Sequence, residues 1–207
     1  MKLLALIAGL ASIRAAIERH DVDEAARQGT LAGPAVVLEA LRDRDRTAQL
    51  AGIAAATHVE DRAELLGRLA TIAGGADRRT AIPAARAAKQ IARELGAHTV
   101  PDDLAAEDLA AWHDTWLALA TRGDRWIELR VLALDVAAAL GDVPLSTDPD
   151  PAIRLAAIEL QPSPLPDVLR APLAAIIAHD ADERVVLGAA QVLCAGEAKR
   201  CLDARPR

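Results

Sequence analysis

The stretch Asp148–Leu160 reads DPDPAIRLAAIEL and has the features of a helix start. A short carboxylate at Asp148 or Asp150 can accept the free amide protons of a first helical turn. Pro151 suits the first helical position, where no amide donor is needed and φ is already fixed. The apolar residues that follow recur at i, i+3, i+4 and i+7, namely Ile153, Ala156, Ala157 and Leu160. The stretch therefore predicts a capped helix with one apolar face.

The same D-x-D signal occurs twice more, each time between two short apolar segments. Asp180-x-Asp182 aligns with Asp148-x-Asp150 at a shift of 32 residues, and Asp43-x-Asp45 aligns at a shift of 105. Small residues follow each pair at matching offsets: Ala156 and Ala157, Gly188 and Ala189, Ala51 and Gly52. Repeats of about 30–45 residues built from helix pairs are typical of α-solenoids. We therefore predict an all-α chain, an α-solenoid of about 10–12 antiparallel helices.

Two longer segments carry a family resemblance. GPAVVLEALRDRDRTAQLAGIAAA (33–56) and RAPLAAIIAHDADERVVLGAAQVL (170–193) resemble HEAT repeats, especially the short bacterial, PBS-lyase-like type. DPDPAIRLAAIEL resembles the second helix of such a repeat, with Ile153-Arg154 at the usual Val-Arg position. In the other copies the arginine is displaced to Arg184 or replaced by Gln49. The resemblance implies degenerate HEAT pairs over roughly two thirds of the chain, and it says little about activity.

The D-x-D pairs have a second interpretation. In some glycosyltransferases a D-x-D pair holds a metal ion and a sugar nucleotide, which requires a strand end and a nucleotide-binding sheet. All three pairs in this sequence precede helical patterns instead. We therefore interpret them as helix caps.

Composition limits the core and the partners. Apolar residues make up 52% of the 207 residues, but Phe and Tyr are absent, so Leu, Ile, Val and Ala must form the core. Residues 1–100 carry 14 basic and 12 acidic side chains, a net charge of +2, whereas residues 101–207 carry 10 and 18, a net charge of −8. Phosphate binding needs a positive surface. The acidic half argues against nucleic acid as a partner and is compatible with a basic protein.

The N-terminal segment has two interpretations. Lys2 followed by LLALIAGLA resembles the start of a secretory signal peptide, which would cover residues 1–16. The same leucines and isoleucines also continue a helical stripe that suits a first solenoid helix. This apolar run is too short to span a bilayer, and no transmembrane span is expected. A cytoplasmic and an exported location therefore both stay open.

Both cysteines lie near the C-terminal end of the sequence. Cys194 and Cys201 are seven residues apart, which on one straight helix is two turns and too far for a disulfide. A turn between them would allow a disulfide that fixes the last helix; the alternative is two reduced thiols.

We expect one domain over residues 1–207, with an internal boundary at 97–101.

Two groups of side chains are candidate partner-binding residues. Trp112, Trp116 and Trp126 lie within fifteen residues of a chain that has no other aromatic side chain except histidine. They either fill a gap between two helices, as aromatics at helical spacing usually do, or form a binding hot spot. A basic stripe on the predicted helix 78–95 consists of Arg79, Arg86, Lys89 and Arg93. It is either the solvated back of that helix or a contact for an acidic partner.

Catalytic motifs are missing from the sequence. It contains no glycine-rich phosphate loop, H-E-x-x-H, G-x-S-x-G or metal-spaced Cys/His set. His113 and Asp114 are neighbours near the tryptophans, but adjacent helical residues point about 100° apart, so we expect no hydrogen bond between them. We assign no catalytic, metal-binding or cofactor-binding residue. The expected function is a non-enzymatic scaffold that presents a curved helical surface to a protein or peptide.

Two alternative functions stay open. Some HEAT-like proteins are similar to DNA glycosylases, which use tryptophans and an aspartate on a basic face, as Trp112, Asp114, Trp116 and Trp126 would. That reaction requires a positive surface near Trp112. The other alternative is a purely structural module of a larger assembly.

Overall fold

The computed structural model describes residues 2–59, 62–97 and 106–194. This part of the chain contains eleven α-helices, one short 3-10 helix and no strand. The predicted all-α class is therefore confirmed. The helices are α1 (Lys2–Glu18), α2 (Val22–Ala32), α3 (Pro34–Arg42), α4 (Arg46–Ala56), η1 (Arg62–Glu64), α5 (Leu65–Ala73), α6 (Arg78–Ala97), α7 (Ala106–Ala120), α8 (Ile127–Leu140), α9 (Pro151–Glu159), α10 (Asp167–His179) and α11 (Glu183–Leu193).

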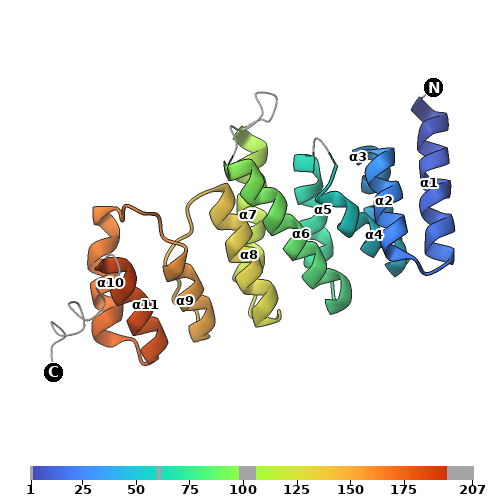
Figure 1. Ribbon diagram of the computed structural model, residues 1–207. Helices are drawn as coiled ribbons and strands as arrows, with labels where there is room; N and C mark the ends of the chain where they lie inside the picture. The colour runs from blue at the N-terminus through green and yellow to red at the C-terminus, as the bar shows by residue number, and fades with distance from the viewer. Residues whose placement is uncertain (1, 60–61, 98–105, 195–207) are drawn as a thin grey trace.

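The helices follow one another along the molecule from α1 at one end to the pair α10 and α11 at the other, where α11 lies on the side of α9 (Figure 1). In one row, α2, α4, α6, α8, α9 and α11 each pack against the next. In a second row, α1, α3, α5 and α7 do the same. The rows are joined by helix pairs: α1 with α2, α3 with α4, α5 with α6, α7 with α8, and α10 with α11. The molecule is thus a stack of helix pairs, and its classification as a HEAT superhelix stays a prediction.

Helix α9 interrupts this pairing. It packs against α8 and α11, but none of the described helices pairs with it as α7 pairs with α8. Residues 141–150, which connect α8 to α9, contain no helix. A non-helical segment therefore stands where the pattern of the stack calls for a helix.

The apolar interior is divided into three clusters. The large central cluster reaches from Val37 on α3 to Ile153 and Ala157 on α9. A C-terminal cluster contains Ile158 of α9 with side chains of α10 and α11, such as Leu173. A third cluster joins α1 to α2, α3 and α4. Helix α9 is therefore shared between the central and the C-terminal clusters.

Small side chains allow the helices to lie close together. Helix α6 buries Ala81, Ala84, Ala85, Ala88 and Ala92, and it packs against α4, α5 and α8. The core consists almost entirely of Ala, Leu, Ile and Val, as the composition predicted. The close packing of the helices compensates for the apolar area that large aromatic side chains would otherwise bury.

Gly52 lies at a close contact between α3 and α4. A Cβ atom added at Gly52 would lie 3.1 Å from both the Ala40 Cβ and the Leu41 backbone nitrogen. We expect Gly52→Val to lower the free energy of unfolding by about 1–3 kcal/mol, because the added methyl groups force the two helices apart. Urea denaturation followed by circular dichroism measures this change.

Ala54→Val is the matched control, because Ala54 lies on the same helix and is exposed. It should change stability by less than about 0.7 kcal/mol, the range of helix propensities. Equal losses in the two variants would contradict the role of close α3–α4 packing.

Candidate functional site

The three D-x-D pairs form helix-capping joints in the structure. In each joint the second aspartate accepts a hydrogen bond from a backbone amide of the helix that follows, at 2.8–2.9 Å. The first aspartate accepts the amide of the second, at 2.9–3.0 Å. The capping residues are Asp45 for α4, Asp150 for α9 and Asp182 for α11. The interpretation of these pairs as helix caps is confirmed.

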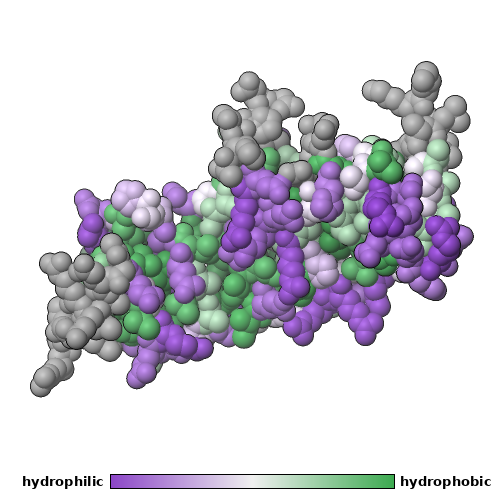
Figure 2. All heavy atoms as spheres, in the orientation of Figure 1, coloured by the Kyte–Doolittle hydropathy of each residue, from purple (hydrophilic) through white to green (hydrophobic). Residues whose placement is uncertain are grey.

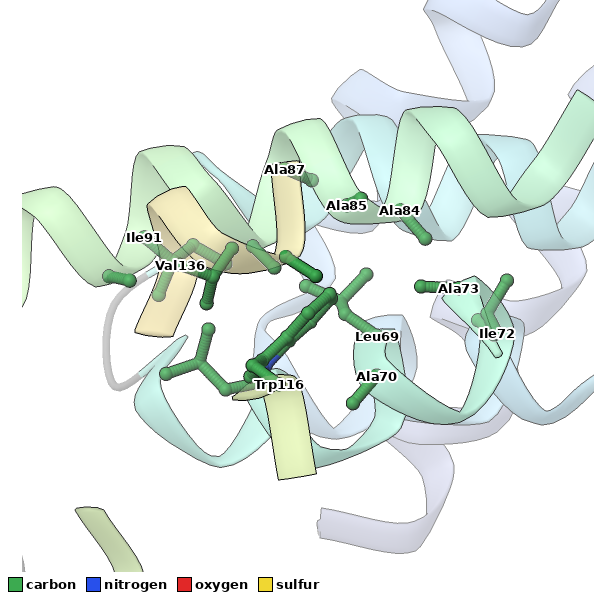
Figure 3. Close-up of a cluster of buried hydrophobic side chains, with 14 of the residues drawn as sticks. Leu69, Ala70, Ile72, Ala73, Ala84, Ala85, Ala87, Ile91, Trp116 and Val136 are labelled. Atoms are coloured by element: carbon green, nitrogen blue, oxygen red, sulfur yellow. The ribbon is translucent and has the colours of Figure 1, made fainter. Parts of the chain in front are cut away.

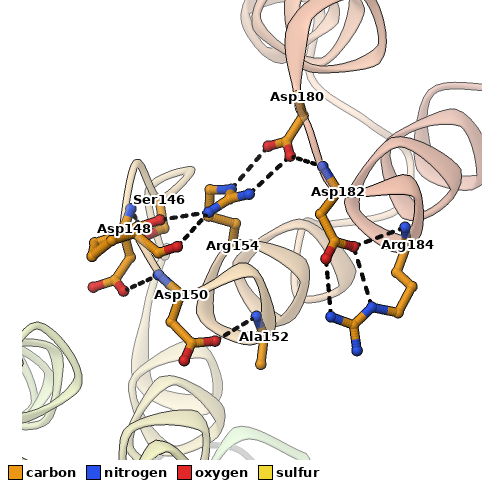
Figure 4. Close-up of polar contacts among 9 residues, drawn as sticks. Ser146, Asp148, Asp150, Ala152, Arg154, Asp180, Asp182 and Arg184 are labelled. Atoms are coloured by element: carbon orange, nitrogen blue, oxygen red, sulfur yellow. Dashed lines mark hydrogen bonds and ion pairs between the residues drawn. The ribbon is translucent and has the colours of Figure 1, made fainter.

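In two of the joints the first aspartate also binds an arginine from the preceding helix of the row, and Figure 4 shows the pair of Arg154 with Asp180. Arg154 of α9 donates two hydrogen bonds to Asp180, of 2.9 and 2.8 Å. Arg130 of α8 donates one hydrogen bond to Asp148 through Nη2, while its Nε donates to the carbonyl oxygen of Ala120, and the side chains of Arg130 and Asp148 are both largely buried. Each joint therefore fixes the start of one helix and holds it to its neighbour.

Charge and burial oppose each other at these carboxylates. The hydrogen bonds of Arg154 lower the pKa of Asp180, although burial acts in the other direction. Burial raises the pKa of Asp148, but the bonds from Arg130 and from the Asp150 amide outweigh it, so that the pKa lies below its usual value. Both carboxylates are therefore ionised at neutral pH, and each pairs with an arginine of the protein itself.

The glutamine that replaces Arg154 in the first joint keeps part of its function. Gln49 Nε2 donates to the carbonyl oxygen of Asp43 at 2.8 Å. Arg154 Nη1 donates to the carbonyl oxygen of Asp148 at the same distance. Gln49 thus keeps the hydrogen bond to the backbone of its own D-x-D pair, but it does not form an ion pair like that of Arg154 with Asp180.

Residues 141–150, which we call the strap, contain no helix or strand and are held in place by side chains of the surrounding helices. His113 Nε2 lies 2.9 Å from the carbonyl oxygen of Asp142, and Gln161 Nε2 donates to the carbonyl oxygen of Val143 at 3.0 Å. At the other end Arg154 binds the carbonyl oxygens of Asp148 and Pro149. Side chains thus satisfy the carbonyl groups that a helix would satisfy internally.

Hollows lie on both sides of the strap. One of about 390 Å³ lies toward α7 and is lined by residues such as Leu117, Leu145 and Ile153. Two others, of about 470 and 500 Å³, lie toward α10, beside Val168 and Ala175 respectively. We call the space formed by these three hollows, between α7 and α10, the strap gap.

Helix α10 exposes an apolar surface beside the strap gap. The side chain of Val168 is 77% exposed, and Ala171, Pro172, Ala174 and Ala175 are also exposed. On the face drawn in Figure 2, apolar side chains reach the surface over α9 and its neighbouring helices. An exposed apolar patch on a protein surface is typical of an interaction site.

A fourth hollow, of about 580 Å³, lies at the other end of the stack between α2 and α4. It is lined by Asp23, Leu31 and Ala54, among others, and Leu31 is 81% exposed. Both helices here have a partner in the second row, so no helix position is vacant. We therefore treat this hollow as a comparison for the strap gap.

The tryptophans do not form a surface cluster. Trp116 is completely buried, and Figure 3 shows it among side chains of α5, α6 and α8 that include Leu69, Ile91 and Val136. Trp112 is partly buried above Gly67, and Trp126 is partly buried at the start of α8. The proposal of Trp116 as a partner-binding residue is wrong for this conformation, because its indole fills the space between the helix pairs.

The basic stripe of α6 faces carboxylates of α8. Arg86 binds Glu128 at 2.7 Å, and Lys89 and Arg93 both pair with Asp135. Arg79 is exposed, and it has no ion pair within the described residues. Most of the basic stripe therefore joins α6 to α8. The hydrogen bonds that Glu128 accepts from Arg78 and Arg86 lower its pKa.

His113 and Asp114 do interact, contrary to the prediction. The Nδ1 atom of His113 lies 3.1 Å from a carboxylate oxygen of Asp114. The 100° angle between adjacent side chains does not separate them, because the imidazole packs beside Gly141 and the Asp114 carboxylate reaches its Nδ1 atom. The other ring nitrogen, Nε2, contacts the carbonyl oxygen of Asp142, so the ring connects α7 to the strap.

Several predictions concern residues that the structure describes only in part. Cys201 lies outside the described residues, and the disulfide with Cys194 stays a prediction. Residues 98–101 of the predicted boundary also lie outside them. Residues 2–18 form α1, and the cleavage of residues 1–16 as a signal peptide stays a prediction. Within the described residues, no helix is long and apolar enough to cross a membrane.

Comparisons with known proteins give no match: no protein-family model, curated protein or solved structure matches the chain. A function for the chain is therefore inferred from its own geometry.

The strap gap was missed by the sequence analysis, although a signal for it exists. Leu129-Arg130 and Ile153-Arg154 occupy the same place on α8 and α9, at a shift of 24 residues. The next repeat follows at a shift of 32. The shorter interval leaves ten residues between α8 and α9, too few for a helix and two turns.

Asp180→Asn tests the contribution of the joint. The change leaves the largely buried Arg154 without an ionised partner, and we expect unfolding at pH 7 to require about 1–3 kcal/mol less. Asp167→Asn is the control, because Asp167 is 97% exposed in its pair with Arg170, and such pairs contribute about 0–1 kcal/mol. Urea denaturation of both variants measures the difference.

The same pair of proteins tests the pKa. Because the pKa of Asp180 is lowered on folding, its contribution is complete above the unfolded value of about 3.9 and is lost as the pH falls through the folded value. The stability difference between wild type and Asp180→Asn should therefore shrink below about pH 4. A difference that is constant from pH 7 to pH 3 would contradict this account.

Proposed function

We propose that the chain is a degenerate HEAT-repeat α-solenoid that acts as a non-enzymatic scaffold and binds a protein partner in the strap gap. The observation that carries the proposal is the unpaired helix α9. Each of the other described α-helices has a partner helix in its pair, whereas α9, which packs against α8 and α11 in its row, has the non-helical strap in the place of such a partner. A partner that fills this position would complete the stack.

The HEAT-like part of the proposal is supported by the repeated joints. Three D-x-D joints cap helices in the same way, and two of them bind an arginine of the preceding helix. Contacts of this kind connect each repeat mainly to its neighbours, as is typical of solenoids.

Charge favours a protein partner over nucleic acid. Helix α7, which carries Trp112 and Trp116, has the acidic residues Glu107, Asp108 and Asp114 and no Lys or Arg. The positive surface that DNA chemistry requires near Trp112 is not supported by these residues. Since Trp116 is buried, the tryptophans also do not offer a stack of exposed rings to a base.

The test compares what the full chain captures from a lysate of its source with what two variants capture. Val168→Asn with Ala175→Gln makes the strap gap polar without touching buried residues, since both side chains are exposed. The matched control is Leu31→Asn with Ala54→Gln, which makes the same kind of change in the hollow between α2 and α4. Quantitative mass spectrometry should find a protein that wild type and control retain and that the strap-gap variant loses by at least about tenfold, a loss of about 1.4 kcal/mol.

Equal capture by all three proteins would overturn the strap gap as the binding site. Specific loss in the control variant would move the site to the hollow between α2 and α4. Thermal unfolding of each variant shows that it is folded before the comparison is made.

A further inference from the structure

We infer that the partner segment is an amphipathic α-helix whose apolar stripe is flanked by Lys or Arg. This inference rests on the proposed function, because it names the chemistry of the partner for the same strap gap. It follows from three properties of the gap: its apolar lining, the state of its backbone groups and its charge.

The lining requires an apolar stripe. Leu117 and Leu145 line the hollow toward α7, and Leu160 and Val168 line one of those toward α10. The side chains of Leu117, Leu145 and Leu160 are only half-buried, and Val168 is largely exposed. A partner that brings leucine-sized side chains at helical spacing would remove this area from water.

The backbone of the strap disfavours an added β-strand. The carbonyl groups of Asp142, Val143, Asp148 and Pro149 already bond to side chains. Pro144 and Pro149 have no amide proton to donate. Strand addition needs a continuous run of free donors and acceptors. A helix satisfies its own backbone groups and needs only side-chain contacts, as the paired helices elsewhere in the stack do.

The charge selects a basic helix. Residues 106–194 contain 14 acidic residues, 6 arginines and no lysine, a formal net charge of −8. The arginines of this half are used in ion pairs with Asp124, Asp148, Asp167, Asp180 and Asp182. Asp142 in the strap and Glu159 at the end of α9 are exposed, and neither has an ion pair within the described residues. Lys or Arg beside the apolar stripe would face these free carboxylates.

The experiment measures binding of three fluorescein-labelled 18-residue peptides to the full chain by fluorescence anisotropy. The first places leucines on one helical face and lysines on the other. The second replaces every lysine with glutamate, and the third has the composition of the first in scrambled order. The first peptide should bind at least about tenfold more tightly than either of the others. Its affinity should fall as NaCl is raised, because part of the attraction is electrostatic.

Two variants locate the peptide. Val168→Asn with Asp142→Lys changes one apolar and one acidic residue of the strap gap, both exposed. Leu31→Asn with Asp23→Lys makes the same changes in the hollow between α2 and α4. The first double variant should weaken binding of the lysine peptide by at least about tenfold, and the second should leave it within about twofold.

Three outcomes would overturn the inference: equal binding of the lysine and glutamate peptides, no binding of any peptide, or loss of binding in the second double variant. None of them decides the proposed function, which depends on capture through Val168 and Ala175. If that capture holds and the peptides fail, the partner occupies the gap with a different kind of surface.

Discussion

The structure depends on one carboxylate that accepts two kinds of hydrogen bond. Asp180 receives the backbone amide of Asp182, which fixes the start of α11, and the guanidinium of Arg154, which belongs to the preceding helix of the row. The conformation of the joint and the position of the neighbouring helix are therefore coupled. Asp148 repeats the arrangement with Arg130. Because these ion pairs are largely shielded from water, we expect them to contribute more to the choice of the neighbouring helix than to net stability.

Arginines make other contacts between successive pairs as well. Arg68 donates to the carbonyl oxygen of Leu41, and Arg125 donates to that of Gly75, so that each links its own helix pair to the end of a helix in the preceding pair. The basic stripe of α6 belongs to the same scheme, since it pairs with α8. Within the described residues, many of the cationic side chains thus bind groups of a neighbouring helix or of the residues just before it. The acidic side chains that remain on the C-terminal half therefore set the charge that a partner meets.

The sequence was sufficient for the features that depend on neighbouring residues. Caps and the apolar period are local, so the joints at Asp45, Asp150 and Asp182 and the helices after them followed from the pattern. The surroundings of a side chain depend on residues far away in the chain. Helical spacing placed Trp116 on a face but did not show that α5, α6 and α8 enclose it. The pairing of Arg86 with Glu128 joins residues 42 positions apart. The strap gap lies where the repeat is interrupted. Aligning similar segments does not show such an interruption, and it becomes visible only when the numbers of residues between successive repeats are compared.

Helix α9 is short, yet it contributes to two apolar clusters. Ile153 and Ala157 belong to the central cluster, and Ile158 belongs to the C-terminal one. A single residue inserted between Ile153 and Ala157 would turn the rest of the helix by about 100° relative to its first turn. The two halves of the molecule would then no longer share one continuous set of contacts. The length of α9 is therefore constrained from both sides, and over evolutionary time we expect changes in chain length to accumulate at the ends of the stack and in its turns.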